Sequence, residues 1–450
     1  MKRPRAPQRA LRRWLSRTPP PAVLAVGYLA LIGLGGFLLM LPPMARAPIT
    51  LMDALFTSTS AVTVTGLAVV DTELTFTFWG ELVIIFLVQL GGLGLMTFAV
   101  LLWSMLGLPM GITQGNYLRE DLNQTSYTRL WRLVWVILRI VIMAEVAGAM
   151  LLSLSFMPNH GLAAGLWHAI FHSVSAFNNA GFSTFSAGLT DYALDPMVNT
   201  VVPALFIAGG IGYVVIADIW QKPVWRGWSL HTRMMMIGTA VLIVGGVAMT
   251  AFLEWNNPRT LGQFDNAGAR LTVAWFQGVT TRTAGFNSTD IGGLHDSTSL
   301  MYMILMIIGA GPTSTAGGLK VTTIFVMLLA AVAFLRRRTE VTAFGRSIPL
   351  GDVLKVMALM TIASGVILTA IFTLMISHDG EFIDIAFEVS SAFGTTGLSR
   401  GYTAQLSDFG RLVIMVVMFL GRVGPLTLGF FLATRTTPRV RYPAGQVHLG

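Results

Sequence analysis

Residues 272–286 read TVAWFQGVTTRTAGF, a short helix-capable segment that ends in a polar turn before Gly285. Three other segments resemble it: DALFTSTSAVTVTGL (53–67), HAIFHSVSAFNNAGF (168–182) and DIAFEVSSAFGTTGL (384–398). Their shared glycines lie 115, 104 and 112 residues apart and are Gly66, Gly181, Gly285 and Gly397. An aromatic residue stands ten positions before each glycine: Phe56, Phe171, Trp275 and Phe387. The residues six positions before are Ser60, Ser175, Val279 and Ser391. Such self-similarity predicts one structural unit repeated four times.

Each of these segments is too short to cross a membrane. About 10 helical residues span roughly 15 Å, against a hydrocarbon core of about 30 Å. Irregular backbone at membrane depth is tolerated only inside protein or beside a water-filled path. The sequence therefore predicts four re-entrant segments whose turns meet at a common axis.

The composition places these segments in a membrane protein. Of the 450 residues, 54% are hydrophobic and 11% charged, which argues against a soluble globular domain and against a disordered chain. The absence of cysteine excludes disulfides and thiol chemistry. Eight apolar stretches are long enough to span a bilayer, and they are residues 22–41, 78–103, 132–156, 198–219, 234–253, 300–334, 353–376 and 410–433.

Charged residues are distributed unevenly between the two sides of these stretches. Both ends of the chain and three alternate links hold 21 of the 30 Lys and Arg residues, whereas the four remaining segments hold 14 acids and five basic residues. The positive-inside rule then predicts a multi-pass protein of the cytoplasmic (inner) membrane with both termini cytoplasmic. The basic side contacts anionic lipid headgroups, and we expect no nucleic-acid partner.

The predicted fold is an all-α polytopic membrane protein with four helix–pore-loop–helix repeats. Eight transmembrane helices and four re-entrant pore helices surround one central ion pore with pseudo-fourfold symmetry. The repeats comprise residues 1–104, 105–220, 221–337 and 338–450. Each carries one of the four glycines, so each contributes one turn to the axis.

The second helices of the repeats carry a further glycine motif. Residues 91–94 and 209–212 read GGLG and GGIG, and residues 421–424 read GRVG. In the third repeat the run GAGPTSTAGG (309–318) takes this place. Glycine costs about 1 kcal/mol and proline about 3 kcal/mol in a helix interior. The sequence therefore predicts a broken helix whose irregular loop borders the path.

Four glycine turns around one axis can present a ring of backbone carbonyls. Carbonyl oxygens can replace the hydration shell of a monovalent cation, and glycine allows the positive φ and close approach that this requires. The turns contain no carboxylate, which disfavours Ca²⁺. The candidate cation ligands and bracing residues are Thr63, Val64, Thr65, Gly66, Asn178, Asn179, Ala180, Gly181, Arg282, Thr283, Ala284, Gly285, Gly394, Thr395, Thr396 and Gly397.

With these turns, the 309–318 run and Arg422, the chain resembles the Ktr/Trk/HKT superfamily of potassium transporters, and most resembles the ion-conducting subunit of KtrB type. The resemblance implies potassium uptake through a channel-like pore with a four-loop carbonyl selectivity filter, K⁺ as the transported ion and no organic cofactor. It also implies a homodimer with one pore per subunit, a cytosolic ring of nucleotide-binding regulatory subunits of KtrA type, and Na⁺ activation as in some relatives. None of the turns reads TVGYG, so strict K⁺ over Na⁺ selectivity is not implied.

The same resemblance makes the 309–318 run an intramembrane gate below the filter. Arg422 replaces a motif glycine in mid-helix, where a charge is costly, and is expected to form a barrier to cations. Lys320 either holds the loop through a carboxylate or helix dipole, or faces the cytoplasm from a helix end. The gate residues are Gly309, Gly311, Pro312, Thr313, Ser314, Thr315, Ala316, Gly317, Gly318, Lys320 and Arg422.

Other ionisable residues have weaker interpretations. Arg282 is expected to point behind the filter, with Glu388 or another pore-helix acid as its partner. His168 and His172 have i, i+4 spacing, but no third ligand accompanies them, so a metal site is disfavoured. Glu81 and Glu145 receive no role. The alternative functions are an ion-coupled secondary carrier, a weakly selective K⁺/Na⁺ pathway and a membrane enzyme. The parallel repeats disfavour the carrier, and only the histidine pair supports an enzyme.

Overall fold

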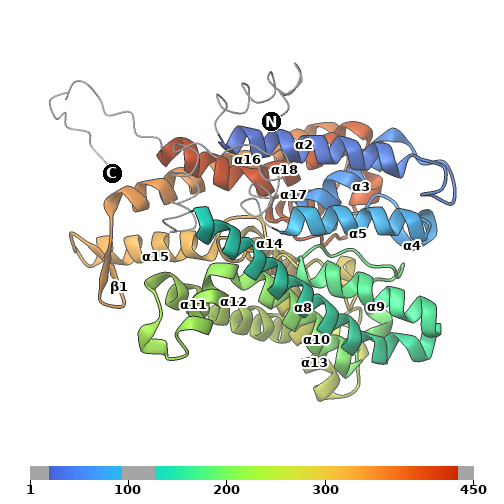
Figure 1. The fold of residues 1–450 in the computed structure, drawn as a ribbon, viewed down its shortest axis with the longest axis horizontal. Helices are drawn as coiled ribbons and strands as arrows, with labels where there is room; N and C mark the ends of the chain where they lie inside the picture. The colour runs from blue at the N-terminus through green and yellow to red at the C-terminus, as the bar shows by residue number, and fades with distance from the viewer. Residues whose placement is uncertain (1–19, 94–126, 434–450) are drawn as a thin grey trace, which may run out of the picture.

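The computed structural model describes residues 20–93 and 127–433 (Figure 1). The predicted cytoplasmic segments at both termini, and most of the link over 104–132, lie outside the described residues. Most of the longer helices lie roughly parallel to one another in this view, and the helix over 127–160 crosses them obliquely. The α-helices are α2 (Pro20–Leu39), α3 (Leu51–Thr63), α4 (Thr72–Thr75), α5 (Phe78–Gly92), α8 (Tyr127–His160), α9 (Leu162–Phe177), α10 (Pro196–Ile211), α11 (Tyr213–Gln221), α12 (Leu230–Glu254), α13 (Ala267–Thr280), α14 (Asp296–Ile307), α15 (Val321–Leu335), α16 (Leu350–Ser377), α17 (Phe382–Gly394) and α18 (Asp408–Ala433).

Short 3₁₀ turns and one hairpin complete the described structure. The 3₁₀ turns are η1 (Thr190–Tyr192), η2 (Trp225–Gly227), η3 (Leu261–Gln263), η4 (Ile291–Gly293) and η5 (Thr403–Gln405). The hairpin pairs β1 (Val341–Ala343) with β2 (Arg346–Ile348) between α15 and α16. The prediction of an all-α chain was wrong at this link, where the β-branched residues of β1 and Gly345 at φ 74° suit a tight hairpin.

Four short helices, which we call the turn helices, carry the repeated segments: α3, α9, α13 and α17. They have 13, 16, 14 and 13 residues. Each packs against the helix that precedes it, in the pairs α2 with α3, α8 with α9, α12 with α13, and α16 with α17. A capping side chain starts two of them, α3 and α13. Thr50, for example, forms a reciprocal capping box with Asp53 at the start of α3.

The helices following the turns link each unit to the next. The helix α5 packs on α9, α10 packs on α13, and α14 packs on α17. The series closes because α18 packs on α3 and α2. The four turn helices therefore lie in cyclic order, each between the helices of its own unit and of the unit before it.

Two of these following helices are broken. Residues 308–320 separate α14 from α15, as the Gly- and Pro-rich run predicts. The predicted span over 198–219 contains a sharp bend that was not expected, because α10 and α11 meet at 91°. The break lies at Gly212, whose φ is 98°. A β-carbon there would lie 2.6 Å from the carbonyl oxygen of Pro312, so the bend and the 308–320 loop fit together.

Every one of the eight predicted apolar stretches contains a described helix. Among the described residues, three helices are long and apolar enough to cross a membrane, and they are Trp135–His160, Leu230–Glu254 and Leu350–Ser377. The bent pair of α10 and α11 forms a fourth candidate span. The full count of eight crossings stays a prediction.

Candidate functional site: a ring of four glycine turns

The four turn helices end in the same backbone conformation. In every turn the residue two positions before the shared glycine is left-handed, with φ between 49° and 61°, and these residues are Val64, Asn179, Thr283 and Thr395. The glycines themselves have φ of 87°, 68°, 77° and 95°, in the order Gly66, Gly181, Gly285 and Gly397. Left-handed backbone is unfavourable for residues with a β-carbon. The same strained conformation in all four turns therefore indicates that the four turns have a common function.

Hydrogen bonds to the turn helix fix this conformation. The N–H groups of Thr65, Ala180 and Thr396 donate to the carbonyls five residues earlier, at 2.8, 2.8 and 2.9 Å. In the third turn Ala284 N donates to Thr280 O at 3.0 Å, which is only four residues earlier. The third turn is therefore one residue shorter than the others.

This shortening corrects the alignment made from sequence. Phe276, not Trp275, is the fully buried aromatic of the third turn helix, while Trp275 is 37% exposed. Thr280, not Val279, takes the place of Ser175. The hydroxyl groups of Thr280 and Ser175 donate to the carbonyls of Phe286 and Phe182, the residues that follow the glycines, at 2.7 and 2.8 Å.

The turns meet one another through their glycines. A β-carbon on Gly181 would lie 3.0 Å from the carbonyl oxygen of Ala284 and 3.0 Å from Cα of Gly285. In the other three turns, a β-carbon on the shared glycine would lie much closer to a carbonyl oxygen than van der Waals contact allows. The pairs are Gly66 with Ala180 O, Gly285 with Thr396 O, and Gly397 with Thr65 O. Each carbonyl comes from the residue just before the next glycine. The four turns thus form a closed ring.

The glycine motifs of the following helices allow those helices to approach the ring closely. β-Carbons on Gly91, Gly209 and Gly421 would collide with the carbonyls of Val62, Phe177 and Phe393. These three carbonyls stand at the same position, four residues before the shared glycine. The motifs therefore place the helices against the C-terminal ends of the turn helices.

The loop over 308–320 lies against the ring and is held by backbone hydrogen bonds. Gly311 N donates to Gly210 O at 2.8 Å, and Thr315 N to Gly209 O at 3.3 Å. Gly318 N donates to Gly421 O at 3.2 Å. A β-carbon on Gly317 would strike the side chain of Thr395. The loop therefore contacts two glycine motifs and the fourth turn.

Arg422 is 6% exposed and connects this loop to α5. Its guanidinium donates to the carbonyl of Thr315 and, at 2.6 Å, to that of Gly91. The hydroxyl of Thr315 donates to Asn179 Oδ1 at 2.7 Å. A continuous chain of contacts thus runs from the second turn through the loop to the buried charge.

The other two predicted basic residues also bond backbone carbonyls. Arg282 donates to Thr239 O at 3.5 Å and Gly309 O at 3.4 Å, so it lies behind the ring. The expectation of Glu388 as its partner was wrong, because Glu388 accepts from Ser399 and Thr403. Lys320 donates to Ala316 O at 2.7 Å within the loop, which supports the loop-holding interpretation.

The predicted bracing residues differ in what they contact. Thr63 and Thr65 share a hydrogen bond of 2.7 Å. Asn179 lies 3.4 Å from Thr283 Oγ1. The hydroxyls of Thr395 and Thr396 are buried without a hydrogen-bond partner among the described residues. A β-carbon on Gly394 would strike the carbonyl of Met306.

Two acids without an assigned role support the second turn helix. Asn178 donates to Glu145 Oε1 at 3.0 Å and to Gln89 Oε1 at 2.9 Å. Glu81 accepts from the indole of Trp167 at 2.5 Å. Sequence reasoning missed these contacts because the partners are 33 to 89 residues apart; the one available signal was an acid within an apolar stretch.

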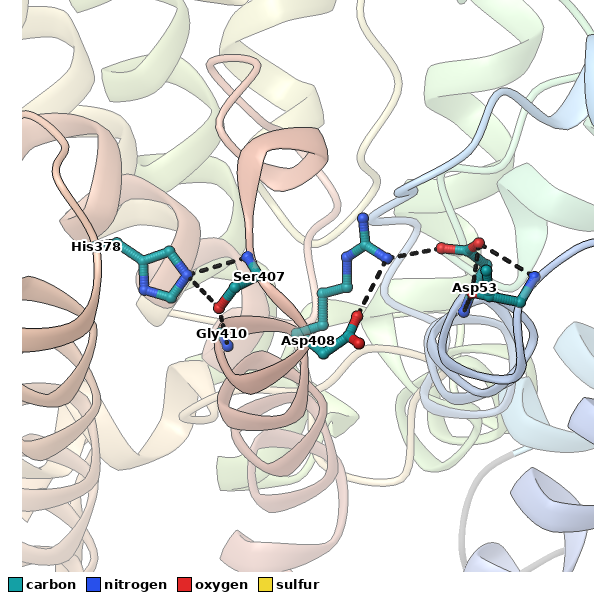
Figure 2. A network of polar contacts seen from close by, with 7 residues as sticks. Asp53, His378, Ser407, Asp408 and Gly410 are labelled. Atoms are coloured by element: carbon teal, nitrogen blue, oxygen red, sulfur yellow. Dashed lines mark hydrogen bonds and ion pairs between the residues drawn. The ribbon is translucent and has the colours of Figure 1, made fainter.

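The first turn of α18 is attached on both sides (Figure 2). His378, at the end of α16, accepts from Ser407 N at 3.1 Å, and Ser407 in turn caps Gly410 N. Arg411 pairs with Asp53 of α3 at 2.8 Å. The fourth unit is thereby joined to the first at the point where the ring closes.

The two histidines of the predicted pair each contact a hydroxyl group. His172 faces Ser183 at 2.9 Å and His168 faces Thr184 at 2.7 Å, both on the segment after Gly181. Within residues 20–93 and 127–433, no group of three His, Cys, Asp or Glu residues could hold a metal ion.

Replacing Thr315 by valine is expected to lower the free energy of unfolding by about 1–3 kcal/mol, because Asn179 Oδ1 becomes a buried acceptor without a donor. Thermal unfolding in detergent measures this. Thr313→Val is the matched control, since the Thr313 hydroxyl bonds only to the carbonyl of neighbouring Pro312 among the contacts described. Equal unfolding temperatures for both variants would contradict the prediction.

Comparison with known proteins identifies a family for the chain. The TrkH family model, described as "Cation transport protein", matches residues 23–436. The Ktr system potassium uptake protein B of Bacillus subtilis (strain 168) is 43% identical over 438 residues, covering 97% of this chain and 98% of that protein. The potassium/sodium uptake protein NtpJ of Enterococcus hirae is 36% identical over 444 residues, with coverages of 96% and 98%.

A solved structure shows a similar fold. The crystal structure of the potassium transporter TrkH from Vibrio parahaemolyticus matches with a TM-score of 0.71 at 20% sequence identity. The match covers 94% of this chain and 86% of that one. At this identity the likeness concerns the fold alone.

Proposed function

The chain belongs to the TrkH family of cation transport proteins and is of the KtrB type, and from that premise we propose that it takes up K⁺ across the cytoplasmic membrane. The ion would pass through the centre of the four glycine turns. The observation that carries this proposal is the closed ring, in which the carbonyl before each shared glycine lies against the shared glycine of the preceding turn. Relatives named as potassium uptake proteins support the choice of ion.

The chemistry of the ring suits a monovalent cation. Thr65, Ala180, Ala284 and Thr396 supply the four carbonyls that flank the glycines, and carbonyl oxygens can replace the water around K⁺. Burial of the turns keeps competing water away from these oxygens. In the proposed arrangement the repeats form one pore, and the turns form its selectivity filter.

We assign the gate to the 309–318 loop and Arg422. A buried positive charge repels a cation, and this repulsion is strong where water is excluded. The hydrogen bonds from Arg422 to the loop and to α5 hold that charge in place. Opening would require the loop to leave Gly209, Gly210 and Gly421.

Regulation and assembly are proposed from the relatives. Their names assign them to a Ktr system, which supports a cytosolic nucleotide-binding partner of KtrA type for this chain. We also propose a homodimer with both termini cytoplasmic. Na⁺ activation is part of the proposal, together with the absence of an organic cofactor.

A weakly selective K⁺/Na⁺ pathway is the second candidate, and two observations favour it. The relative from Enterococcus hirae is named a potassium/sodium uptake protein and is 36% identical. In addition, the third turn is one residue shorter than the others, so the ring departs from exact fourfold symmetry.

Uptake of K⁺, Rb⁺, Na⁺ and Li⁺ into proteoliposomes tests the function, with the purified chain alone and with its cytosolic partner. Selective K⁺ and Rb⁺ entry is expected. Equal Na⁺ entry would replace the proposal with the weakly selective pathway. Uptake that requires a second ion on the same side would instead establish a coupled carrier, and no cation entry under either condition would overturn both.

A further inference from the structure

The segments that leave the ring, which we call the return legs, comprise residues 67–70, 182–185, 286–289 and 398–401. The second return leg is tied to its own turn helix by two side-chain contacts. His172 Nδ1 lies 2.8 Å from the carbonyl of His168, so this nitrogen donates and Nε2 accepts from Ser183 Oγ at 2.9 Å. His168 Nδ1 lies 2.7 Å from Thr184 Oγ1. The contacts form a two-rung ladder.

The fourth return leg has the same ladder at the same positions. Glu388, nine residues before its glycine as His172 is, accepts from Ser399, two residues after the glycine as Ser183 is. Asp384, thirteen residues before the glycine as His168 is, accepts from Arg400 Nε at 2.6 Å. Within the leg, Ser399 Oγ accepts from Gly401 N at 2.9 Å. Ser183 Oγ accepts in the same way from Phe185 N at 3.0 Å.

The other two turns are braced differently. In the shortened third turn, Gln277 takes the place of His172 and lies 3.2 Å from Ser288 Oγ. Turning its amide lets the oxygen accept from Ser288 N at 2.6 Å. In the first turn, Thr57 Oγ1 is buried without a hydrogen-bond partner in the described structure, and Ala68 occupies the place of Ser183.

The second and fourth turns lie opposite each other, because the glycine contacts run in the order 66, 181, 285 and 397 and then return to 66. We propose that the two ladders are a matched pair of braces that set the size of the ring, so that Ser183, Ser399, His172 and Glu388 are positioning residues for ion selectivity. This inference rests on the proposed function.

The ladders act by making the ring rigid. The turns hold strained backbone, and their return legs lack helical hydrogen bonds of their own. Without a ladder, a return leg is free to move away from its turn helix. The ring carbonyl of the same turn can then move inward toward a smaller ion. K⁺ and Na⁺ differ chiefly in size, so a ring that adapts loses the distinction between them. Because the two ladders brace turns on opposite sides of the ring, both restrain the ring diameter that joins these turns.

Equilibrium ion binding tests the proposal without requiring an open gate. Binding of K⁺ and Na⁺ to the purified full chain is measured by calorimetry for wild type, Ser183→Ala, Ser399→Ala and Glu388→Gln. Thr272→Ala is the matched control, because its hydroxyl bonds the Gly268 carbonyl of its own turn helix at 3.0 Å. The ratio of the K⁺ and Na⁺ dissociation constants is the readout. A change that only loosened the fold would weaken both ions alike.

We expect the K⁺ preference to fall about tenfold in each alanine variant, which corresponds to about 1.4 kcal/mol. Glu388→Gln keeps an acceptor for Ser399 and is expected to retain the preference, as is the control. If the wild type prefers K⁺ and both alanine variants keep the same ratio of dissociation constants, the proposed role of the ladders is contradicted and the proposed function is not. A wild type that binds K⁺ no better than Na⁺ would instead overturn the selective filter itself.

Discussion

Serine at position 285 is expected to abolish K⁺ selectivity. Gly285 has a φ of 77°, and a β-carbon on it would strike the carbonyl of Thr396. Left-handed backbone alone costs a residue with a side chain about 1–2 kcal/mol. The collision adds to that cost, and it falls on one of the four ring carbonyls. We expect the K⁺/Na⁺ uptake ratio to fall more than tenfold, because about 1.4 kcal/mol already corresponds to a factor of ten.

Uptake assays in cells without their own K⁺ uptake systems measure this ratio. Gly161→Ser is the matched control, because Gly161 has a φ of 79° and no atom within 4 Å of its β-carbon site. It therefore bears the conformational cost without the collision. Gly181→Ser is expected to be milder than Gly285→Ser, because its β-carbon would stand 3.0 Å from the nearest carbonyl. Retained selectivity in Gly285→Ser would speak against the ring as filter.

Replacing Arg422 by alanine is expected to increase K⁺ flux about thirtyfold. A unit charge about 8 Å from an ion raises its energy by about 2 kcal/mol at an effective dielectric constant of about 20, and each 1.36 kcal/mol changes a rate about tenfold. The substitution also removes the hydrogen bonds to Thr315 and Gly91. Both effects favour passage.

Arg422→Lys separates the two causes. Lysine keeps the charge but not the planar fork that reaches two carbonyls. If the charge dominates, the lysine variant conducts like the wild type, whereas a tethering role would give it a raised flux. Flux is measured in proteoliposomes at matched protein content. An alanine variant that conducts no faster than wild type would remove Arg422 from the gate.

The sequence predicted the elements whose signal is local. The four turns carry glycine at a fixed place after a short amphipathic segment, and glycine adopts the positive φ found at that place without steric cost. The break over 309–318 was predictable because Gly and Pro are concentrated there. Arg422 was identifiable as a residue of special interest, because an arginine in the middle of a membrane helix is costly. In each case the responsible residues are neighbours in the chain.

Other features depend on contacts that the sequence does not display. The bend at Gly212 follows from the packing of Pro312 against it, whereas α18 continues through the related residues 421–424. The shortened third turn was hidden because Trp275 stands beside Phe276 and Val279 beside Thr280. The ladders escaped notice because one uses histidines and the other carboxylates, so similar geometry is built from dissimilar residues.

The left-handed position of the four turns is occupied by three different residue types, in Val64, Asn179, Thr283 and Thr395. In a pore assembled from four identical subunits, any substitution is copied four times and its effect is multiplied. Here a single codon change replaces a residue in one of the four turns and leaves the sequence of the other three unchanged. In the proposed filter, selection can therefore change one turn at a time, and the four turns are free to diverge into separate specialised roles.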